Sequence, residues 1–177
     1  MSETKKLDIY TAILDPNEAA PCAKICNEFH CGDLLDYDTV YQFGKQVDLL
    51  TIEIENVNID ALDALAAEGL PIYPKPENLR IIQGKADQKS FYEKNDIPTA
   101  PFKRFDTLQA LQTAVENAEV TLPFVWKAAR FGYDGNGVKI IRQASDLNNL
   151  TPDACIAENL VPFKNELAVI VARNASG

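Results

Sequence analysis

Apolar runs that alternate with helical patterns limit what the first half of this chain can fold into. The runs are LDIYTAIL (residues 7–14), VDLLTIEI (47–54) and the shorter PIYP (71–74). Continuous apolar runs of this length are typical of strands in a buried parallel sheet. The helical patterns between them are NEAAPCAKICNEF (17–29), YDTVYQFGKQ (37–46) and NIDALDALAAEG (58–69), the last of which opens on Asn58 as a cap and closes on Gly69. This alternation predicts an α/β fold with a doubly wound sheet.

The pattern changes after Pro101. Before it, a longer helix is predicted over residues 77–95, because Pro76 suits a first helical turn and IPTAP ends the pattern. After it come one amphipathic helix, TLQALQTAVENA (107–118), and four short strands, FVWKAA (124–129), GVKIIR (137–142), ACIAEN (154–159) and ELAVIVAR (166–173). Short connections between the first two and between the last two predict hairpins. We therefore expect an α/β domain over residues 1–95 and a small α+β domain over residues 96–177.

Both ends of the chain suggest a part of something larger. Only about six residues precede the first apolar run, too few for the strand and helix with which a doubly wound domain of this kind normally opens. The other end follows directly on an apolar strand that needs a partner.

Charge excludes two classes of partner. The 177 residues carry a net charge of -9, and residues 1–95 hold most of it, with nine Lys and Arg against seventeen Asp and Glu. Such acidity argues against a nucleic-acid or anionic-membrane surface. No apolar run approaches the roughly 20 residues that span a bilayer, and the N-terminus lacks a signal-peptide core, so a cytoplasmic location is expected.

The cysteines follow no secreted disulfide pattern and are expected to be reduced. Cys22, Cys26 and His30 would share one face if residues 17–29 were helical. Two interpretations stay open: a metal site, or small side chains that pack a buried helix with the histidine at its end.

A glycine-rich loop, Gly132 to Gly137, separates two of the predicted strands. It reads Gly132, Tyr133, Asp134, Gly135, Asn136, Gly137. Glycine lets backbone N–H groups approach an anion closely, although an ordinary tight turn has the same composition. Lys127 favours the anion, because a strand interior seldom holds a buried cation that has no counter-charge. The local charge is also basic, since Lys127, Arg130, Lys139 and Arg142 stand against Asp134 alone.

Two pairs of glutamates lie at strand ends. Glu158 and Glu166 flank NLVPFKN, where carboxylates could accept hydrogen bonds from an amine or from sugar hydroxyls, or could simply be solvated. Glu53 and Glu55 alternate in TIEIENVN, at the carboxyl end of a predicted strand. Period-2 placement would send both to one face, for a ligand or for a salt-bridged edge.

Together these stretches resemble the 5-(carboxyamino)imidazole ribonucleotide synthases, ATP-grasp enzymes also called the ATPase subunit of phosphoribosylaminoimidazole carboxylase. The matching pieces are ILDPNEAAPC, DLLTIEIENV, YPKPENLRIIQGKADQKSFYEKNDIPTAPF, PFVWKAARFGYDGNGVKII and AENLVPFKNELAVIVARN. The resemblance implies a truncated doubly wound pre-ATP-grasp domain followed by the small α+β ATP-grasp subdomain. It implies a ligase that makes carboxyphosphate from ATP and bicarbonate and carboxylates aminoimidazole ribonucleotide in purine biosynthesis, in a family where dimers are common.

The resemblance also implies roles for individual residues. Lys127 and Lys85 would hold ATP phosphates, and the backbone of residues 132–137 would close over them. Glu158 would meet the adenine amine, the backbone at Leu160 and Val161 its ring edge, and Glu166 the ribose hydroxyls. Tyr133, Asp134 and Glu55 would face the imidazole nucleotide or bicarbonate.

Departures from the family pattern limit these expectations. Gly84 stands where the family usually has Asp, and Asn136 where it often has a basic residue. The family's opening GGGQLG loop and the C-terminal part that supplies the magnesium ligands are absent, so we expect an incomplete metal site. Two alternatives remain: a non-catalytic nucleotide-binding fragment or assembly partner, and a sibling ATP-grasp ligase such as a glycinamide ribonucleotide transformylase or a biotin-carboxylase-like enzyme.

Overall fold

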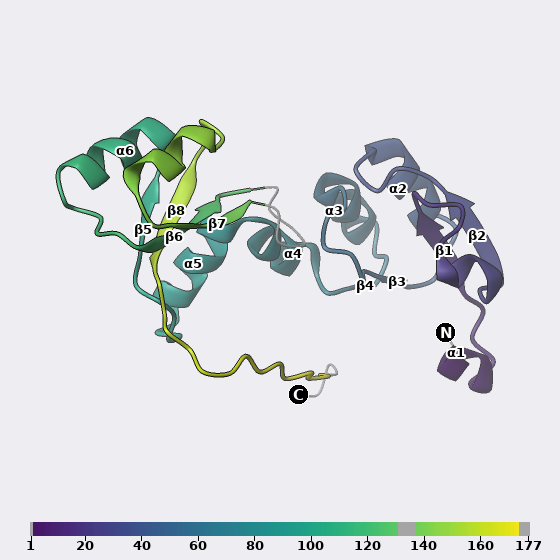
Figure 1. The fold of residues 1–177 in the computed structure, drawn as a ribbon. Helices are drawn as coiled ribbons and strands as arrows, with labels where there is room; N and C mark the ends of the chain where they lie inside the picture. The colour runs from purple at the N-terminus through teal and green to yellow at the C-terminus, as the bar shows by residue number, and fades with distance from the viewer. Residues whose placement is uncertain (1, 131–136, 174–177) are drawn as a thin grey trace. The chain divides into compact units, whose positions relative to one another are not determined.

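The chain folds into two compact units, Met1–Asn95 and Asp96–Gly177 (Figure 1). The structure is a computed structural model that describes residues 2–130 and 137–173. Each unit has its own hydrophobic core.

The first unit contains two pairs of parallel strands, each joined by a helical crossover. The order of elements is α1 (Ser2–Lys6), β1 (Ala12–Asp15), the 3₁₀ helix η1 (Pro21–Lys24), β2 (Glu28–Cys31), α2 (Tyr37–Gly44), β3 (Leu50–Thr51), α3 (Ile59–Ala67), β4 (Ile72–Tyr73), α4 (Pro76–Gln83) and α5 (Lys85–Lys94). Strand β1 pairs with β2, and β3 pairs with β4. Parallel strands that alternate with helices confirm the predicted α/β class.

Helices α2 and α3 provide much of the core of this unit. Their starts are set locally, because Asp36 accepts a hydrogen bond from the Thr39 amide at 2.8 Å and Asn58 accepts one from the Ala61 amide at 2.9 Å. The core residues are Val40, Phe43, Leu50, Val57, Ala61, Leu62, Leu65, Ile72 and Leu79. The predicted helices over residues 37–46 and 58–69 are therefore confirmed, with frayed last residues.

Two helix predictions and two strand predictions for the first unit are wrong in part. Residues 17–29 form no continuous helix: Pro21 begins a single 3₁₀ turn, and Glu28 already belongs to β2, a strand that we did not predict. The helix predicted over residues 77–95 is two helices, which meet at Gly84 in an extended conformation. The strands predicted over residues 7–14 and 47–54 shorten to Ala12–Asp15 and Leu50–Thr51.

The second unit is a four-stranded antiparallel sheet with one helix against it. Its elements are β5 (Phe102–Phe105), α6 (Leu108–Glu116), β6 (Phe124–Ala128), β7 (Val138–Ile141), the 3₁₀ helix η2 (Ala144–Asn149) and β8 (Cys155–Asn159). The strand order is β5-β8-β6-β7. Thr107 caps α6 by accepting a hydrogen bond from the Ala110 amide at 3.2 Å.

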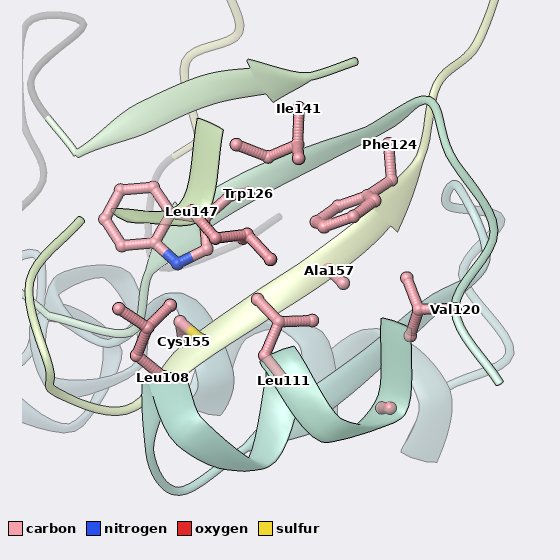
Figure 2. Packing of buried hydrophobic residues seen from close by; sticks show 10 residues of the cluster. Leu108, Leu111, Val120, Phe124, Trp126, Ile141, Leu147, Cys155 and Ala157 are labelled. Carbon is pink, nitrogen blue, oxygen red and sulfur yellow. The ribbon is translucent and has the colours of Figure 1, made fainter. Parts of the chain in front are cut away.

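The main hydrophobic cluster of this unit lies on the sheet face that packs against α6. Side chains of α6 point at alternate residues of β6 and β8, and Phe124 and Trp126 lie between the helix and the sheet (Figure 2). The core residues are Leu108, Leu111, Ala114, Val120, Phe124, Trp126, Ile141, Leu147, Cys155 and Ala157. The opposite face also holds nearly buried side chains, since Ile156 is 0% and Glu158 5% exposed.

Two predictions for the second unit are wrong. Strand β5 was not predicted, because FKRF reads as two charges between two aromatics and shows no clear alternation. Residues 166–173 are not a strand, and so no hairpin joins them to β8; Leu167, Val169, Ile170 and Val171 are each more than 80% exposed. Pairing with a neighbouring strand, which this segment lacks here, decides strand formation more than an apolar composition does.

Burial should make Cys155 the least reactive of the cysteines. Its side chain is 1% exposed, and burial raises the pKa of the thiol, whereas Cys31 is exposed. Because the thiolate is the nucleophile, we expect iodoacetamide at pH 8 to modify Cys31 first and Cys155 only when the chain unfolds. Peptide mass spectrometry with and without urea measures this difference. Equal labelling rates without urea would contradict the buried position of Cys155.

None of the helices that the structure describes is long and apolar enough to cross a membrane.

Candidate functional site

Lys127 and Glu158 form an ion pair on the sheet face that α6 does not cover. Lys127 on β6 is paired in register with Ile156, and Glu158 on β8 with Val125, so the two charged side chains are diagonal neighbours. The Lys127 Nζ atom contacts Glu158 Oε2, with 28% and 7% of the two side chains exposed. The lysine for which the sequence required a counter-charge therefore has one within the chain.

Two rows of side chains cross this face. One row reads Phe102, Glu158, Val125, Ile140 and the next reads Arg104, Ile156, Lys127, Val138. Glu158 thus has Phe102 and Val125 as its in-register neighbours, and Arg104 and Lys127 are its diagonal neighbours in the adjacent row. Arg104 also stacks over the Phe102 ring at 4.9 Å. A lysine that pairs with a carboxylate can also form a charge-assisted hydrogen bond to an anionic ligand.

Apolar surface adjoins the charged pair. Val138 and Ile140 on β7 are each 42% exposed and share the face with Lys127. A surface that joins apolar side chains to a few charged groups is typical of small-molecule sites. This combination suits a ligand with a flat apolar part and an anionic part.

The glycine loop connects β6 to β7, as predicted for an antiparallel hairpin. Gly137 closes it with a φ of 73°, in the left-handed region that favours glycine, and its carbonyl accepts from the Ala128 amide at 2.8 Å. The predicted site residues Gly132, Tyr133, Asp134 and Gly135 lie outside the described residues, as does Asn136. Lys127 directly precedes Ala128, whose hydrogen bond to Gly137 is the last that the described part of the hairpin forms before the loop.

The described segment after β8, residues 160–173, has no regular secondary structure. Leu160 is half-buried, Val161 is 47% exposed, and the Phe163 amide donates to the Val161 carbonyl at 3.0 Å. Glu166 is exposed in this segment, where we had predicted the start of a strand. Its assignment to a sugar hydroxyl stays a prediction.

In the first unit, Glu55 lies in the loop that follows β3. Residues 53–55 form a bend, so the predicted period-2 placement of Glu53 and Glu55 does not apply, although both side chains are exposed. Gln83, the last residue of α4, donates from Nε2 to the Glu55 carbonyl at 2.7 Å and to the Val57 carbonyl at 2.8 Å. The backbone of the loop at Glu55 is thus held by a side chain from helix α4.

Lys85 is the first residue of α5 and is half-buried. Gly84 precedes it, and a Cβ there would come within 2.2 Å of Asp87 Oδ2. The Asp87 carboxylate therefore occupies the space that a side chain at position 84 would need, and its charge suits the first turn of a helix. An acidic group thus lies against position 84 even though Gly84 replaces the expected aspartate.

No metal centre is found in the described part of the chain. Cys22 lies in η1 and His30 on β2, so the helix that would have aligned them with Cys26 does not form. Among the described residues, no three His, Cys, Asp or Glu side chains come together to hold a metal ion. The described residues therefore provide no set of side chains that fits a magnesium site.

Comparison with known proteins identifies the class. The family model of the ribonucleotide synthetase preATP-grasp domain matches residues 1–83, and that of the ATP-grasp domain matches residues 90–177. The chain therefore belongs to the ATP-grasp class of proteins. The N5-carboxyaminoimidazole ribonucleotide synthase of Pseudomonas aeruginosa is 34% identical over 170 residues, which cover 94% of this chain and 46% of that protein.

Two crystal structures from Aspergillus clavatus show which enzymes of this class the chain resembles. Carboxyaminoimidazole ribonucleotide synthase complexed with ATP is 28% identical with a TM-score of 0.81, and the match covers 92% of this chain and 44% of that one. N5-carboxyaminoimidazole synthase in complex with ADP and 5-aminoimidazole ribonucleotide is 26% identical with a TM-score of 0.76, covering 92% and 43%. Within the ATP-grasp class, the chain is thus similar over nearly its whole length to N5-carboxyaminoimidazole ribonucleotide synthases. It spans less than half the length of the Pseudomonas aeruginosa relative.

The structure adds two residues that the sequence did not single out. Arg104 was missed because β5 was missed, and Gln83 because no local pattern shows that its amide reaches residues 55–57. In retrospect, the only available signal for Gln83 was a polar side chain at the end of an amphipathic helix, next to the predicted phosphate residue Lys85.

Proposed function

We propose that this chain takes part in the ATP- and bicarbonate-dependent carboxylation of 5-aminoimidazole ribonucleotide in purine biosynthesis. A bicarbonate oxygen attacks the γ-phosphorus of ATP, ADP leaves, and carboxyphosphate forms. The exocyclic amine then attacks the carboxyl carbon, phosphate leaves, and the amine loses a proton. The observation that carries the proposal is the ordered match to both domain models, with Lys127 and Glu158 paired on one sheet face.

The ion pair suggests how the site meets ATP. In the proposal, a phosphate oxygen replaces Glu158 as the partner of Lys127, and the released carboxylate accepts from the adenine amine. One ligand that carries both an anion and an amine donor can satisfy both residues at once. Phosphoryl transfer depends mainly on positioning and on neutralising charge, which lysines can supply.

Other residues keep their proposed roles. Lys85 and the backbone of Gly132, Gly135 and Gly137 would hold phosphates, Leu160, Val161 and Glu166 would hold the nucleoside, and Tyr133, Asp134 and Glu55 would face the second substrate. Magnesium enters only as the ion supplied with ATP. The proposal includes a cytoplasmic location and a homodimer, by analogy with soluble enzymes of purine biosynthesis.

ADP release tests the proposal directly. We expect the purified chain, given magnesium, ATP and bicarbonate, to release ADP faster when 5-aminoimidazole ribonucleotide is added, because the second substrate consumes carboxyphosphate. Lys127→Met should abolish that stimulation. ATP binding without stimulated turnover would instead support a non-catalytic nucleotide-binding fragment and would overturn the proposed activity.

A further inference from the structure

The loop that carries Glu55 is held at several points by hydrogen bonds from outside the loop. At its start, the Ile52 amide donates to the Tyr73 carbonyl at 2.9 Å. At its end, the Asn58 amide donates to the Leu34 carbonyl and Asn58 Nδ2 donates to the Leu35 carbonyl, each at 2.8 Å. Between these anchors, the loop contributes one buried side chain, Val57, which is 5% exposed.

Gln83 supplies the anchor in the middle. Both hydrogens of its Nε2 group are used, one for the Glu55 carbonyl and one for the Val57 carbonyl. Two carbonyl acceptors require the amide nitrogen, so the orientation of the carboxamide follows from its partners. The Val57 amide also donates to the Glu55 carbonyl at 3.0 Å, which closes a tight turn around the same point. The turn at residues 55–57 is thus fixed while the Glu55 side chain stays exposed.

We infer that Gln83 is a positioning residue for the second substrate: its carboxamide fixes the backbone turn at residues 55–57 and so sets where the Glu55 carboxylate meets the imidazole nucleotide. This inference rests on the proposed function, because the role of Glu55 is part of it. A carboxylate on a fixed backbone loses less conformational freedom when it binds a ligand, so its contact is stronger. Gln83 needs no contact with the ligand to have this effect.

Gln83→Met tests the inference, since methionine keeps the length of the side chain and removes both donors. We expect 5-aminoimidazole ribonucleotide to bind about fivefold to tenfold more weakly, as expected for two lost hydrogen bonds that act indirectly. Calorimetric titration of wild type, Gln83→Met, Glu55→Gln and the double variant completes a cycle. If Gln83 acts through Glu55, the double variant binds no more weakly than Glu55→Gln alone.

Hydrogen exchange gives a second measurement that needs no ligand. The Val57 amide should exchange faster in Gln83→Met than in wild type. The matched control is Gln46→Met, because Gln46, which follows helix α2, also donates from Nε2 to a backbone carbonyl, that of Gln42 at 3.0 Å. This variant should change neither the affinity nor the exchange of Val57.

The outcomes separate the two proposals. Additive losses in the cycle, or unchanged exchange of Val57, would overturn the role of Gln83 while the proposed function stands. A wild-type chain that binds no imidazole nucleotide would overturn the proposed function and with it the substrate role of Gln83. Faster exchange together with a non-additive cycle supports the inference.

Discussion

Lys127→Met should weaken ATP binding by about tenfold to a hundredfold, the effect of losing a charge-assisted hydrogen bond to phosphate. The structure places this lysine on a sheet face beside exposed apolar side chains, where it contacts Glu158. Methionine keeps the length and the apolar stem and removes the charge. Fluorescence or calorimetric titration with ATP measures the change.

Lys139→Met is the matched control for this variant. Lys139 lies on the neighbouring strand β7 but pairs with Trp126, so it belongs to the opposite face of the sheet. Its Nζ donates to the Asp146 carbonyl at 3.3 Å. We expect nearly unchanged ATP affinity for Lys139→Met. Equal affinity of wild type and Lys127→Met would remove Lys127 from the nucleotide site.

Lys127→Met should also lower the free energy of unfolding of the chain in the absence of ligand. Glu158 has 7% of its side chain exposed, and removal of Lys127 takes away a counter-charge at a nearly buried carboxylate. We expect the free energy of unfolding to fall by about 1 to 3 kcal/mol, less than for a fully buried pair because Lys127 is partly exposed. Adding Glu158→Gln should recover part of the loss.

Phe124→Ala should have the largest effect on folding. Phe124 is 1% exposed in the centre of the second core, and loss of a buried phenylalanine ring costs about 3 to 5 kcal/mol. A domain of this size is stable by only about 5 to 15 kcal/mol in total. Trp126, the only tryptophan, lies in the same core, so its fluorescence during urea unfolding reports this unit.

Phe163→Ala is the control for Phe124→Ala. Phe163 is 70% exposed, so the same truncation there should change the free energy of unfolding by less than about 0.5 kcal/mol. Similar losses for the two variants would contradict the packing of the second core. Phe124→Leu should fall between them, because leucine fills part of the space.

The sequence predicted best the elements whose ends are marked locally. Asn58 and Thr107 begin helices because each side chain accepts from an amide three residues on, which can be read without knowing the fold. Residues 17–29 were predicted wrongly, because spacing alone favoured a helix there. The pairing of Glu28–Cys31 with Ala12–Asp15 is a non-local interaction that local spacing does not report.

Recognition of the candidate site from the sequence had the same limit. Lys127 and Glu158 were each singled out, but their ion pair depends on the register of β6 against β8, which no local pattern fixes. The missing alternation in FKRF hid β5 and with it Arg104. Gln83 contacts a carbonyl 28 residues earlier in the chain, a distance over which spacing carries no information.

The exposed segment of residues 166–173 should affect whether copies of the chain associate in solution. Between Glu166 and Arg173 it reads LAVIVA, an uncharged stretch with high strand propensity whose side chains are exposed. A net charge of -9 makes separate copies repel one another. Salt shortens the range of that repulsion to roughly 8 Å at physiological ionic strength. We therefore expect added salt to favour self-association through the exposed segment.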